Sequence, residues 1–202
     1  MAPLSAFLLH TGLRLGEALA LRWSDVELDG GIIAVRANRV LVGGRIVEGT
    51  PKSRLSTRRF ALPAPALVAL RQQQALQTED ARSASAAPRS KADWVFSTGS
   101  AGSLESGNVS PAFRRVRARA GARNLPLHSL RHASASILPA AGVTVPVAAK
   151  MLGHSVAMFT ETYPDLLVEA TKDAARKVNT FWRAAPQTMP PRRPLLPLRN
   201  PH

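Results

Sequence analysis

The spacing of apolar residues changes along this chain, and each spacing predicts a different kind of element. The first segment has apolar residues at helical spacing, at Leu4, Phe7, Leu8, Leu15, Ala18, Leu19 and Leu21. The pair Thr11-Gly12 interrupts this pattern. The segment therefore predicts two helices joined by a tight turn, with the second helix beginning near Leu13.

The pattern then switches to alternation, which is typical of strands. Ile33, Val35 and Ala37 occupy alternate positions, and a second apolar run over residues 40–42 ends at Gly43-Gly44, a dipeptide that favours a hairpin turn. Residues 46–47 follow the turn, and Arg58 to Leu62 predicts a further short strand. Together these segments predict one small antiparallel sheet.

The rest of the chain returns to helical spacing, with breaks rich in Ser, Ala, Gly and Pro. Pro65 suits the first turn of a helix, and the composition of residues 78–92 and 99–107 is typical of loops. The pair Ser110-Pro111 is a helix start signal, because Ser caps the first turn and Pro fits the first helical position. We expect helices over residues 66–77, from 110 onward, and over 127–141, 145–152, 157–163 and 165–182.

These elements predict a mainly helical α+β fold with a small antiparallel β-sheet. A chain of 202 residues can bury one core, and we expect a single domain over residues 1–184. Residues 185–202 are rich in Pro and Arg and predict a disordered tail. The last helix has an apolar stripe that could pack on the protein's own core, at Leu167, Ala170, Ala174, Val178 and Phe181.

The charge of the chain narrows the class of partner. Lys and Arg number 27 against 13 Asp and Glu, which gives a formal net charge of +14 and an isoelectric point near 11.7. This excess favours a polyanion such as nucleic acid, although solvent-facing arginines need not bind anything. The absence of cysteine excludes disulfides, thiolate metal sites and a cysteine nucleophile, and fits a cytoplasmic protein. No apolar run reaches the length of a membrane span, so no membrane partner is expected.

The sequence around His128 and Arg131 predicts a polar helix face. The two residues are three apart and therefore share one side of the predicted helix. Such a face could meet a phosphate or could simply be solvated. His132 raises a zinc alternative, which the lack of an intervening Glu and of any Cys disfavours. A separate stripe facing the core is expected at Leu130, Ile137, Leu138 and Ala141.

A second group of candidates follows the next predicted helix. Gly153 suits the left-handed position at a helix C-terminus, so His154 should lie just past the helix end. Tyr163, the only tyrosine in the chain, precedes Pro164, which disfavours helical geometry at the residue before it. Tyr163 is therefore expected at a helix boundary, where its hydroxyl could face a groove or its ring could close the core.

Three further candidates lie in the first half of the chain. Arg14 follows the predicted turn at the start of a helix, and helix N-termini already favour anions. Glu17, one turn later, could fix Arg14 or form only an ordinary surface pair. Lys52 lies in a loop between predicted strands, from which its ammonium group could reach a bound phosphodiester.

The candidate residues occur in an order found in one known family: Arg14, Lys52, His128, Arg131, His154 and Tyr163. The chain resembles the catalytic domain of the tyrosine recombinases, the phage integrase family. The resemblance rests on the strings TGLRLGEALALRWSDVEL, TPKSRLSTRRFALP, HSLRHASASILPAAGV, MLGHS and TETY. It covers the chain from about residue 4 to about residue 182.

The resemblance implies site-specific recombination or integration of double-stranded DNA, with neither a cofactor nor a metal. Tyr163 would attack a phosphodiester, form a 3′-phosphotyrosyl bond and release a 5′-hydroxyl group. Arg14 and Arg131 would hold the non-bridging oxygens of the phosphate. Lys52 would protonate the leaving oxygen.

The same resemblance gives supporting roles to the remaining residues. His128 would assist proton transfer at the nucleophile, His154 would hydrogen-bond the phosphate, and Glu17 would hold the arginines. A homotetramer on DNA is implied, with the C-terminal segment docked on a neighbouring protomer, and no small-molecule substrate is expected. Further DNA contacts are expected from Arg54, Arg114, Arg115 and Arg117.

The chain departs from the family pattern at several places, among them Ser129 where Asp is usual and Pro164-Asp165 after the tyrosine. Family members usually carry an N-terminal helical domain that clamps the other side of the DNA, and we expect this chain to lack it, since Met1 falls about ten residues before the Thr11-Gly12 turn. Pro139 is expected to end or kink its helix. The alternative function is therefore an inactive recombinase remnant that only binds DNA or a partner recombinase.

Overall fold

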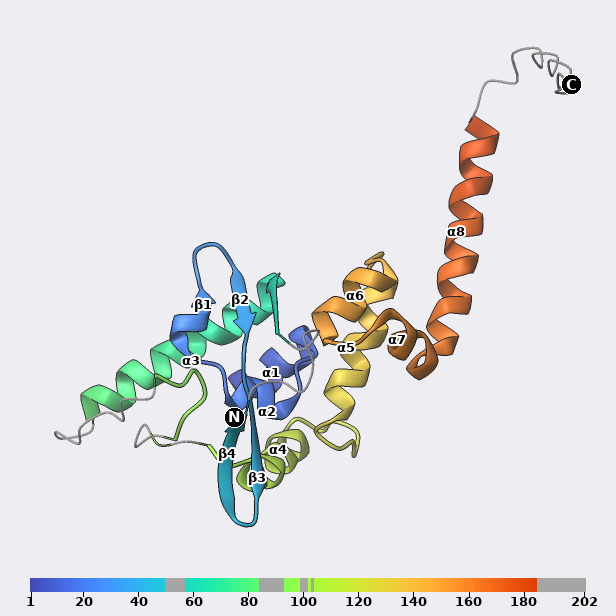
Figure 1. Ribbon diagram of the computed structural model, residues 1–202. Helices are drawn as coiled ribbons and strands as arrows, with labels where there is room; N and C mark the ends of the chain where they lie inside the picture. Colours follow the sequence, from blue (N-terminus) through green and yellow to red (C-terminus); the bar gives the residue numbers. More distant parts are fainter. Residues whose placement is uncertain (50–56, 84–92, 99–101, 103, 185–202) are drawn as a thin grey trace, which may run out of the picture.

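The computed structural model describes residues 1–49, 57–83, 93–98, 102 and 104–184 (Figure 1). The elements in chain order are α1 (Ala2–Thr11), α2 (Leu15–Leu19), the 3-10 helix η1 (Trp23–Asp25), β1 (Val26–Glu27), β2 (Ile32–Val35), β3 (Asn38–Val42), β4 (Arg45–Gly49), β5 (Arg58–Ala61), α3 (Ala64–Ser83), α4 (Ser106–Arg119), α5 (Ser129–Ala140), α6 (Val145–Leu152), α7 (Val156–Thr162) and α8 (Pro164–Ala184). This arrangement confirms the predicted mainly helical α+β class.

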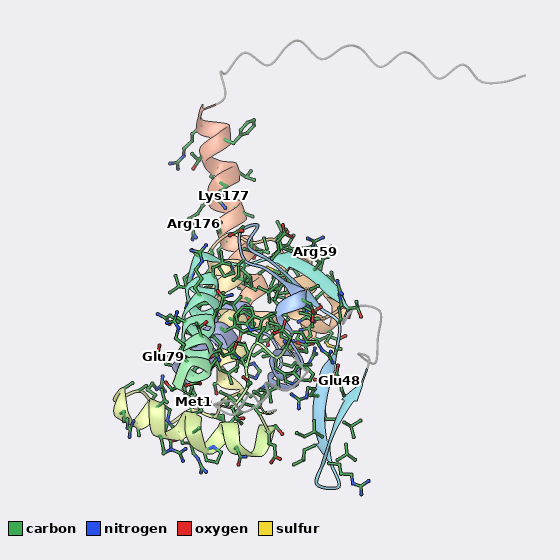
Figure 2. The ribbon with its side chains drawn as sticks, turned by 90° about the vertical axis from the view of Figure 1, so that its left-hand side faces the viewer. Met1, Glu48, Arg59, Glu79, Arg176 and Lys177 are labelled. Atoms are coloured by element: carbon green, nitrogen blue, oxygen red, sulfur yellow. The ribbon has the colours of Figure 1, made fainter. Side chains whose placement is uncertain are left out.

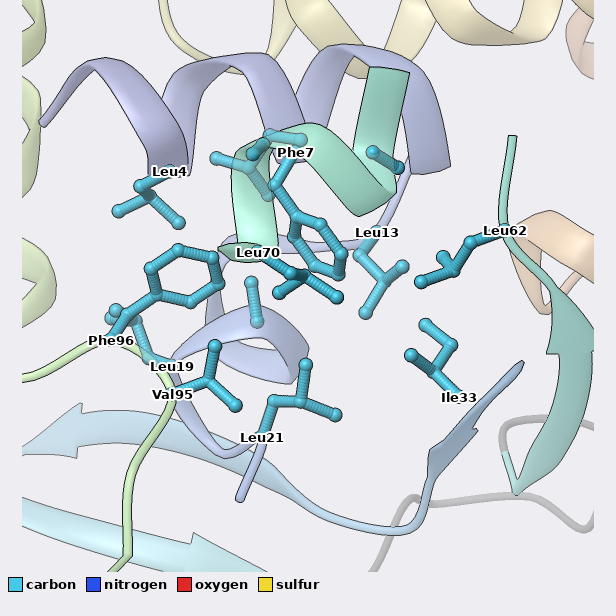
Figure 3. Close-up of a cluster of buried hydrophobic side chains, with 14 of the residues drawn as sticks. Leu4, Phe7, Leu13, Leu19, Leu21, Ile33, Leu62, Leu70, Val95 and Phe96 are labelled. Carbon is cyan, nitrogen blue, oxygen red and sulfur yellow. The ribbon is translucent and has the colours of Figure 1, made fainter. Parts of the chain in front are cut away.

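The larger hydrophobic core is built by the first half of the chain, where α1 packs on α3 (Figure 3). The rings of Phe7 and Phe96 lie 5.4 Å apart between their centroids. Gly12 ends α1 in the left-handed conformation with φ 65°, which confirms the predicted turn between two helices. The fully buried members of this core include Leu4, Phe7, Leu13, Leu19, Leu21, Ile33, Leu70, Val95 and Phe96.

The strands form two separate sheets, so the prediction of one sheet is wrong. β2 pairs with β1 and β5 in an antiparallel sheet, while β3 and β4 form a hairpin of their own around Gly43-Gly44. Arg39 fixes the base of the hairpin: its guanidinium is buried over the Trp94 ring and donates a 2.9 Å hydrogen bond to the carbonyl of Leu19. These contacts of Arg39 hold β3 beside α2. The neighbour of β2 in the sheet is therefore β5 and not β3.

Two predicted helix boundaries were wrong, at the end of α3 and at the start of α4. α3 continues to Ser83, past Gln77, so residues 78–83 are helical rather than loop. α4 begins at Ser106 and holds Pro111 in its interior, so neither the start at Ser110 nor the loop up to residue 107 is confirmed. The buried side chains of Val109 and Phe113 are four apart, and both face the core only if the helix already runs through Val109.

The second half of the chain builds a smaller core from α5, α6 and α7. α6 spans the predicted residues, and Gly153 ends it in the left-handed conformation with φ 68°. α5 ends at Ala140, directly after Pro139. The predicted apolar stripe of α5 is confirmed at Leu130 and Leu138, which pack against the two cores, and is wrong at Ile137 and Ala141, which are exposed. The fully buried positions of α5 are instead Arg131, Ser134 and Ala135. The buried members of this core are Ala135, Ala148, Ala149, Leu152 and Phe159.

Helix α8 projects away from the body of the protein (Figures 1 and 2), and its side chains as far as Arg176 and Lys177 line a pocket together with the end of α5. Val178 and Phe181 are 52% and 68% exposed, so packing of this stripe on the protein's own core is wrong for these two positions. The side chains of Leu167 and Ala170, and the predicted tail over residues 185–202, lie outside the described part of the chain. None of the described helices is both long and apolar enough to cross a membrane.

Candidate active site

Glu17 lies at the centre of a buried ion-pair group at the N-terminus of α2. Its carboxylate accepts a 2.9 Å hydrogen bond from the backbone N–H of Arg14, the residue that caps this helix. The Arg14 guanidinium also contacts the carboxylate at 3.3 Å and stays 40% exposed, while Glu17 is 3% exposed. Glu17 therefore holds Arg14 at the mouth of the site with its guanidinium still accessible.

Arg58, at the start of β5, is a member of this site that the sequence interpretation missed. Its two terminal nitrogens donate to the two carboxylate oxygens of Glu17, each at 3.0 Å, and its Nε donates to the carbonyl of Met151 at 2.8 Å. The sequence did hold a signal, because Arg58 is two residues before Phe60 and therefore shares its face of the strand. In the sheet, Arg58 lies opposite the buried Val35.

Burial and charge act in opposite directions on Glu17. Desolvation by burial alone would raise the pKa of this carboxyl, but the hydrogen bonds and charge of Arg58, with help from Arg14, bring its pKa below the ordinary value. Glu17 is therefore ionised at neutral pH and compensates the two arginines.

Gly153 allows Arg58 to approach the end of α6, and this gives a testable prediction. A Cβ atom at Gly153 would lie 2.8 Å from Nη1 of Arg58, and the left-handed backbone adds strain of about 1–2 kcal/mol for a residue with a side chain. We expect Gly153→Ala to lower the free energy of unfolding, measured by urea denaturation, by more than Gly142→Ala does. Gly142 also has a positive φ, 82°, but no atom near its Cβ position, so equal losses would contradict a contact with Arg58.

Arg131 joins three elements through its guanidinium. Nη1 donates to the carbonyl of Gly12, and Nη2 donates to the carbonyl of Leu152 at 2.7 Å. Nη2 also lies 2.8 Å from Nε2 of His154. Burial and the positive charges of Arg14 and Arg58 lower the pKa of Arg131 to about 10, while Glu17 raises it, so the group stays charged at neutral pH.

His154 is held in one protonation state by Arg131. A guanidinium only donates hydrogen bonds, so Nε2 of His154 accepts and the neutral ring carries its proton on Nδ1. Burial and the charges of Arg131, Arg14 and Arg58 lower the pKa of His154 to about 4. Within the described residues, buried Nδ1 finds no hydrogen-bond partner.

Tyr163 lies at the C-terminal end of α7, as the following proline predicted. Its ring packs against Phe159, with 5.1 Å between centroids, and stacks over His154 at 6.5 Å. Its hydroxyl oxygen lies 3.3 Å from Nδ1 of His132. Burial raises the pKa of Tyr163, and the charges of Arg131 and Arg14 offset this only in part, so the phenol is protonated at neutral pH.

His128 and His132 lie one turn apart on the exposed side of α5, with their rings edge to face at 4.7 Å. Partial burial and the neighbouring His132, Arg131 and Arg14 lower the pKa of His128, so this ring is neutral at neutral pH. His132 entered the sequence interpretation only as a possible zinc ligand. Within the described part of the chain, no three His, Cys, Asp or Glu side chains gather as metal ligands would.

The sequence also matches a known family model. The Phage integrase family model covers residues 3–169. This chain belongs to that family. The match includes every element from α1 to α7, and therefore all the site residues described above.

Two curated members of the family are similar over most of this chain. The tyrosine recombinase XerC-like protein of Caldanaerobacter subterraneus is 24% identical over 187 residues, which cover 85% of this chain and 47% of the relative. The prophage integrase IntR of Escherichia coli K12 is 32% identical over 171 residues, which cover 78% of this chain and 41% of the relative. The chain thus spans less than half the length of these relatives.

Solved structures of the family share the fold. The Tn1549 transposon integrase, in complex with transposon right end DNA, superposes with a TM-score of 0.67 at 20% identity, over 86% of this chain and 58% of that one. The XerA recombinase superposes with a TM-score of 0.60 at 22% identity, over 91% of this chain and 57% of that one.

Within this integrase fold, most of the residues singled out from sequence lie together: Arg14, Glu17, His128, Arg131, His154 and Tyr163. Lys52 and Arg54 lie outside the described residues. Arg114 and Arg115 are exposed on α4, apart from this group, and Arg117 donates a 2.6 Å hydrogen bond to the carbonyl of Leu125. Arg117 therefore has a structural contact that the sequence interpretation did not foresee.

Proposed function

We propose that this chain cleaves and rejoins double-stranded DNA at specific sites in the cytoplasm, with Tyr163 as the nucleophile. One observation carries the proposal: the hydroxyl of the only tyrosine lies beside His132 and near the charged Arg131, in a chain of the integrase family. A phenol can attack a phosphodiester only where cations absorb the charge that develops on the phosphate. Arg14 and Arg131 supply those cations.

In the proposed step, the phenolic oxygen of Tyr163 bonds to phosphorus as the bond to the 5′-oxygen breaks. Arg131 is held by backbone carbonyls, so its guanidinium is oriented before DNA arrives. Arg14 is held by Glu17 and remains accessible to a non-bridging oxygen. Lys52 would protonate the leaving oxygen, and attack by a 5′-hydroxyl on the phosphotyrosyl bond would rejoin the strands.

The positive charge of the chain supports contacts with several DNA phosphates besides the one that is cleaved. The chain carries a net charge of +14, and Arg114 and Arg115 are exposed on α4. Each arginine that neutralises a phosphate adds affinity that falls as salt rises. We propose that Arg114 and Arg115 contact the DNA backbone flanking the cleaved phosphate, and that Arg54 does so from the segment that carries Lys52.

We further propose that α8 docks on a neighbouring protomer in a homotetramer assembled on DNA. Val178 and Phe181 are more than half exposed and lie on one side of this projecting helix, because they are three residues apart. Apolar side chains presented in this way mark a protein contact surface.

The experiment that tests the function is covalent capture on a nicked DNA substrate, in which the cleaved fragment is lost and rejoining is blocked. Wild-type protein should form a covalent protein–DNA adduct, and Tyr163→Phe should bind the DNA without forming it, because only the hydroxyl oxygen is removed. Binding is followed by gel shift and the adduct by denaturing electrophoresis. Salt-sensitive binding by the wild type with no adduct would refute the proposal in favour of a DNA-binding module.

A further inference from the structure

One contact of the nucleophile has no role in the mechanism above. The Tyr163 hydroxyl lies 3.3 Å from Nδ1 of His132, and among the described residues this ring nitrogen is the one hydrogen-bond partner of the hydroxyl. Their rings meet edge to face, with 5.8 Å between centroids. A tyrosine that becomes a nucleophile must lose its proton, so the group at this distance bears on the chemistry.

The fold positions both members of this pair. His132 follows Arg131 directly on α5, so its backbone is fixed by the residue that binds the carbonyls of Gly12 and Leu152. Tyr163 is held by a 3.0 Å hydrogen bond from its backbone N–H to Phe159, and by ring contacts with Phe159 and His154. The fold therefore fixes the backbone of both residues at positions from which their side chains meet.

The other histidines are less suited to accept the phenol proton. Nε2 of His154 already accepts a hydrogen bond from Arg131, and burial beside three arginines opposes any positive charge on that ring. His128 packs its ring against His132 and not against Tyr163, and its neighbours also disfavour its charged form. His132 is exposed to solvent, which can stabilise an imidazolium ion.

We propose that Nδ1 of His132 accepts the phenol proton as Tyr163 attacks the phosphodiester; the inference rests on the proposed function. The phenolic oxygen forms its bond to phosphorus, the bond from phosphorus to the 5′-oxygen breaks, and the leaving oxygen takes a proton from the general acid, for which Lys52 is the candidate. His132 then holds one proton as an imidazolium. When a 5′-hydroxyl attacks the phosphotyrosyl bond, its own proton passes to the deprotonated general acid, and the proton held by His132 returns to the departing oxygen of Tyr163.

The kinetic test compares His132→Asn with the wild type on the nicked substrate at saturating DNA. Asn can still hydrogen-bond the phenol but cannot take its proton, so adduct formation should slow by about 10²-fold or more with DNA affinity unchanged. A substrate with sulfur in place of the leaving 5′-oxygen needs no general acid. This substrate should restore the rate of adduct formation in Lys52→Ala and should leave the rate in His132→Asn low.

Adduct formation by His132→Asn within a few-fold of the wild-type rate would overturn the inference, and so would its rescue by the sulfur substrate. A loss of DNA affinity with a normal rate at saturation would overturn it as well, since His132 would then be a binding residue. His132→Ala gives a second variant of the same position and should be at least as slow as His132→Asn.

A second readout does not depend on cleavage. In the wild-type protein without DNA, nitrogen NMR should show the His132 ring as the tautomer that carries its proton on Nε2, with Nδ1 accepting a hydrogen bond. Tyr163→Phe should change the Nδ1 signal, because it removes the donor. A proton on Nδ1 in the wild type, or no change in Tyr163→Phe, would refute the inference. If the wild type forms no adduct, the proposed function is refuted instead. The NMR measurement would then still show whether the Tyr163 hydroxyl donates to Nδ1 of His132.

Discussion

Glu17→Gln is expected to lower the free energy of unfolding by about 3–5 kcal/mol, because it leaves Arg58 as a buried charge without its carboxylate. Arg58 and Glu17 are 1% and 3% exposed, so water cannot replace the lost partner. The loss would be measured by urea denaturation at neutral pH. A second variant, Glu17→Gln with Arg58→Met, should recover part of the stability, because it removes the buried charge that Glu17 balances in the wild type.

The exposed pair between Arg59 and Glu27 provides a matched control. Its charged atoms are 2.7 Å apart, but the side chains are 66% and 54% exposed, so Glu27→Gln should cost less than about 1 kcal/mol. Equal losses from Glu17→Gln and Glu27→Gln would show that burial of the Arg58–Glu17 pair has no energetic weight.

The buried pair of Arg58 and Glu17 also predicts how the stability of the protein changes with pH. Because the pKa of Glu17 is lowered in the folded protein, its contribution to stability is present above the ordinary carboxyl value of 4.5 and is lost as pH falls through the folded value. Wild-type protein should therefore lose more stability on acidification than Glu17→Gln does. Parallel losses in the two proteins would argue against the lowered pKa.

Arg131→Ala is expected to reduce the rate of adduct formation at saturating DNA by about 10²–10³-fold, because it removes a preorganised donor to the phosphate. It also leaves the carbonyls of Gly12 and Leu152 without their donor, at a cost of about 1–3 kcal/mol each. The rate would be measured by covalent capture on the nicked substrate, and the fold would be checked by circular dichroism.

Two variants separate this chemistry from folding and from general DNA affinity. Arg131→Lys keeps one charge but cannot reach both carbonyls and a phosphate at once, so it should fold better than Arg131→Ala and still cleave slowly. Arg114→Ala, on the exposed face of α4, should weaken binding, reduce its salt dependence by about one phosphate contact, and leave the saturated rate unchanged. Arg131→Ala with a rate within tenfold of wild type would contradict the proposed clamp.

The sequence predicted well the features that depend on a few neighbouring residues. Helix α6 and its end at Gly153 were correct because the proline near its start and the glycine after its end both act locally. Tyr163 was placed at a helix boundary for the same reason, since Pro164 constrains the residue before it. The ordered series of basic residues then identified the family.

The features that failed depend on distant residues. Pro111 is a helix start signal, yet α4 begins before it, and the helical residues before Pro111 include the buried Val109. Arg39 separates the β3–β4 hairpin from the sheet through contacts with Leu19 and Trp94, which no spacing in the sequence indicates. Arg58 was missed because its role appears only when β5 pairs with β2 and faces Glu17.

Arg58 and Arg131 both donate to the last carbonyls of α6, at Met151 and Leu152. They also donate to Glu17 and Gly12, which belong to the half of the chain that builds the larger core. The two hydrophobic cores thus meet along a polar seam made of the residues proposed for chemistry. Any opening between the halves would dismantle the arginine clamp at the same moment. Unfolding and loss of activity should therefore be one cooperative event in this protein, so that a partly open chain does not cleave DNA without being able to rejoin it.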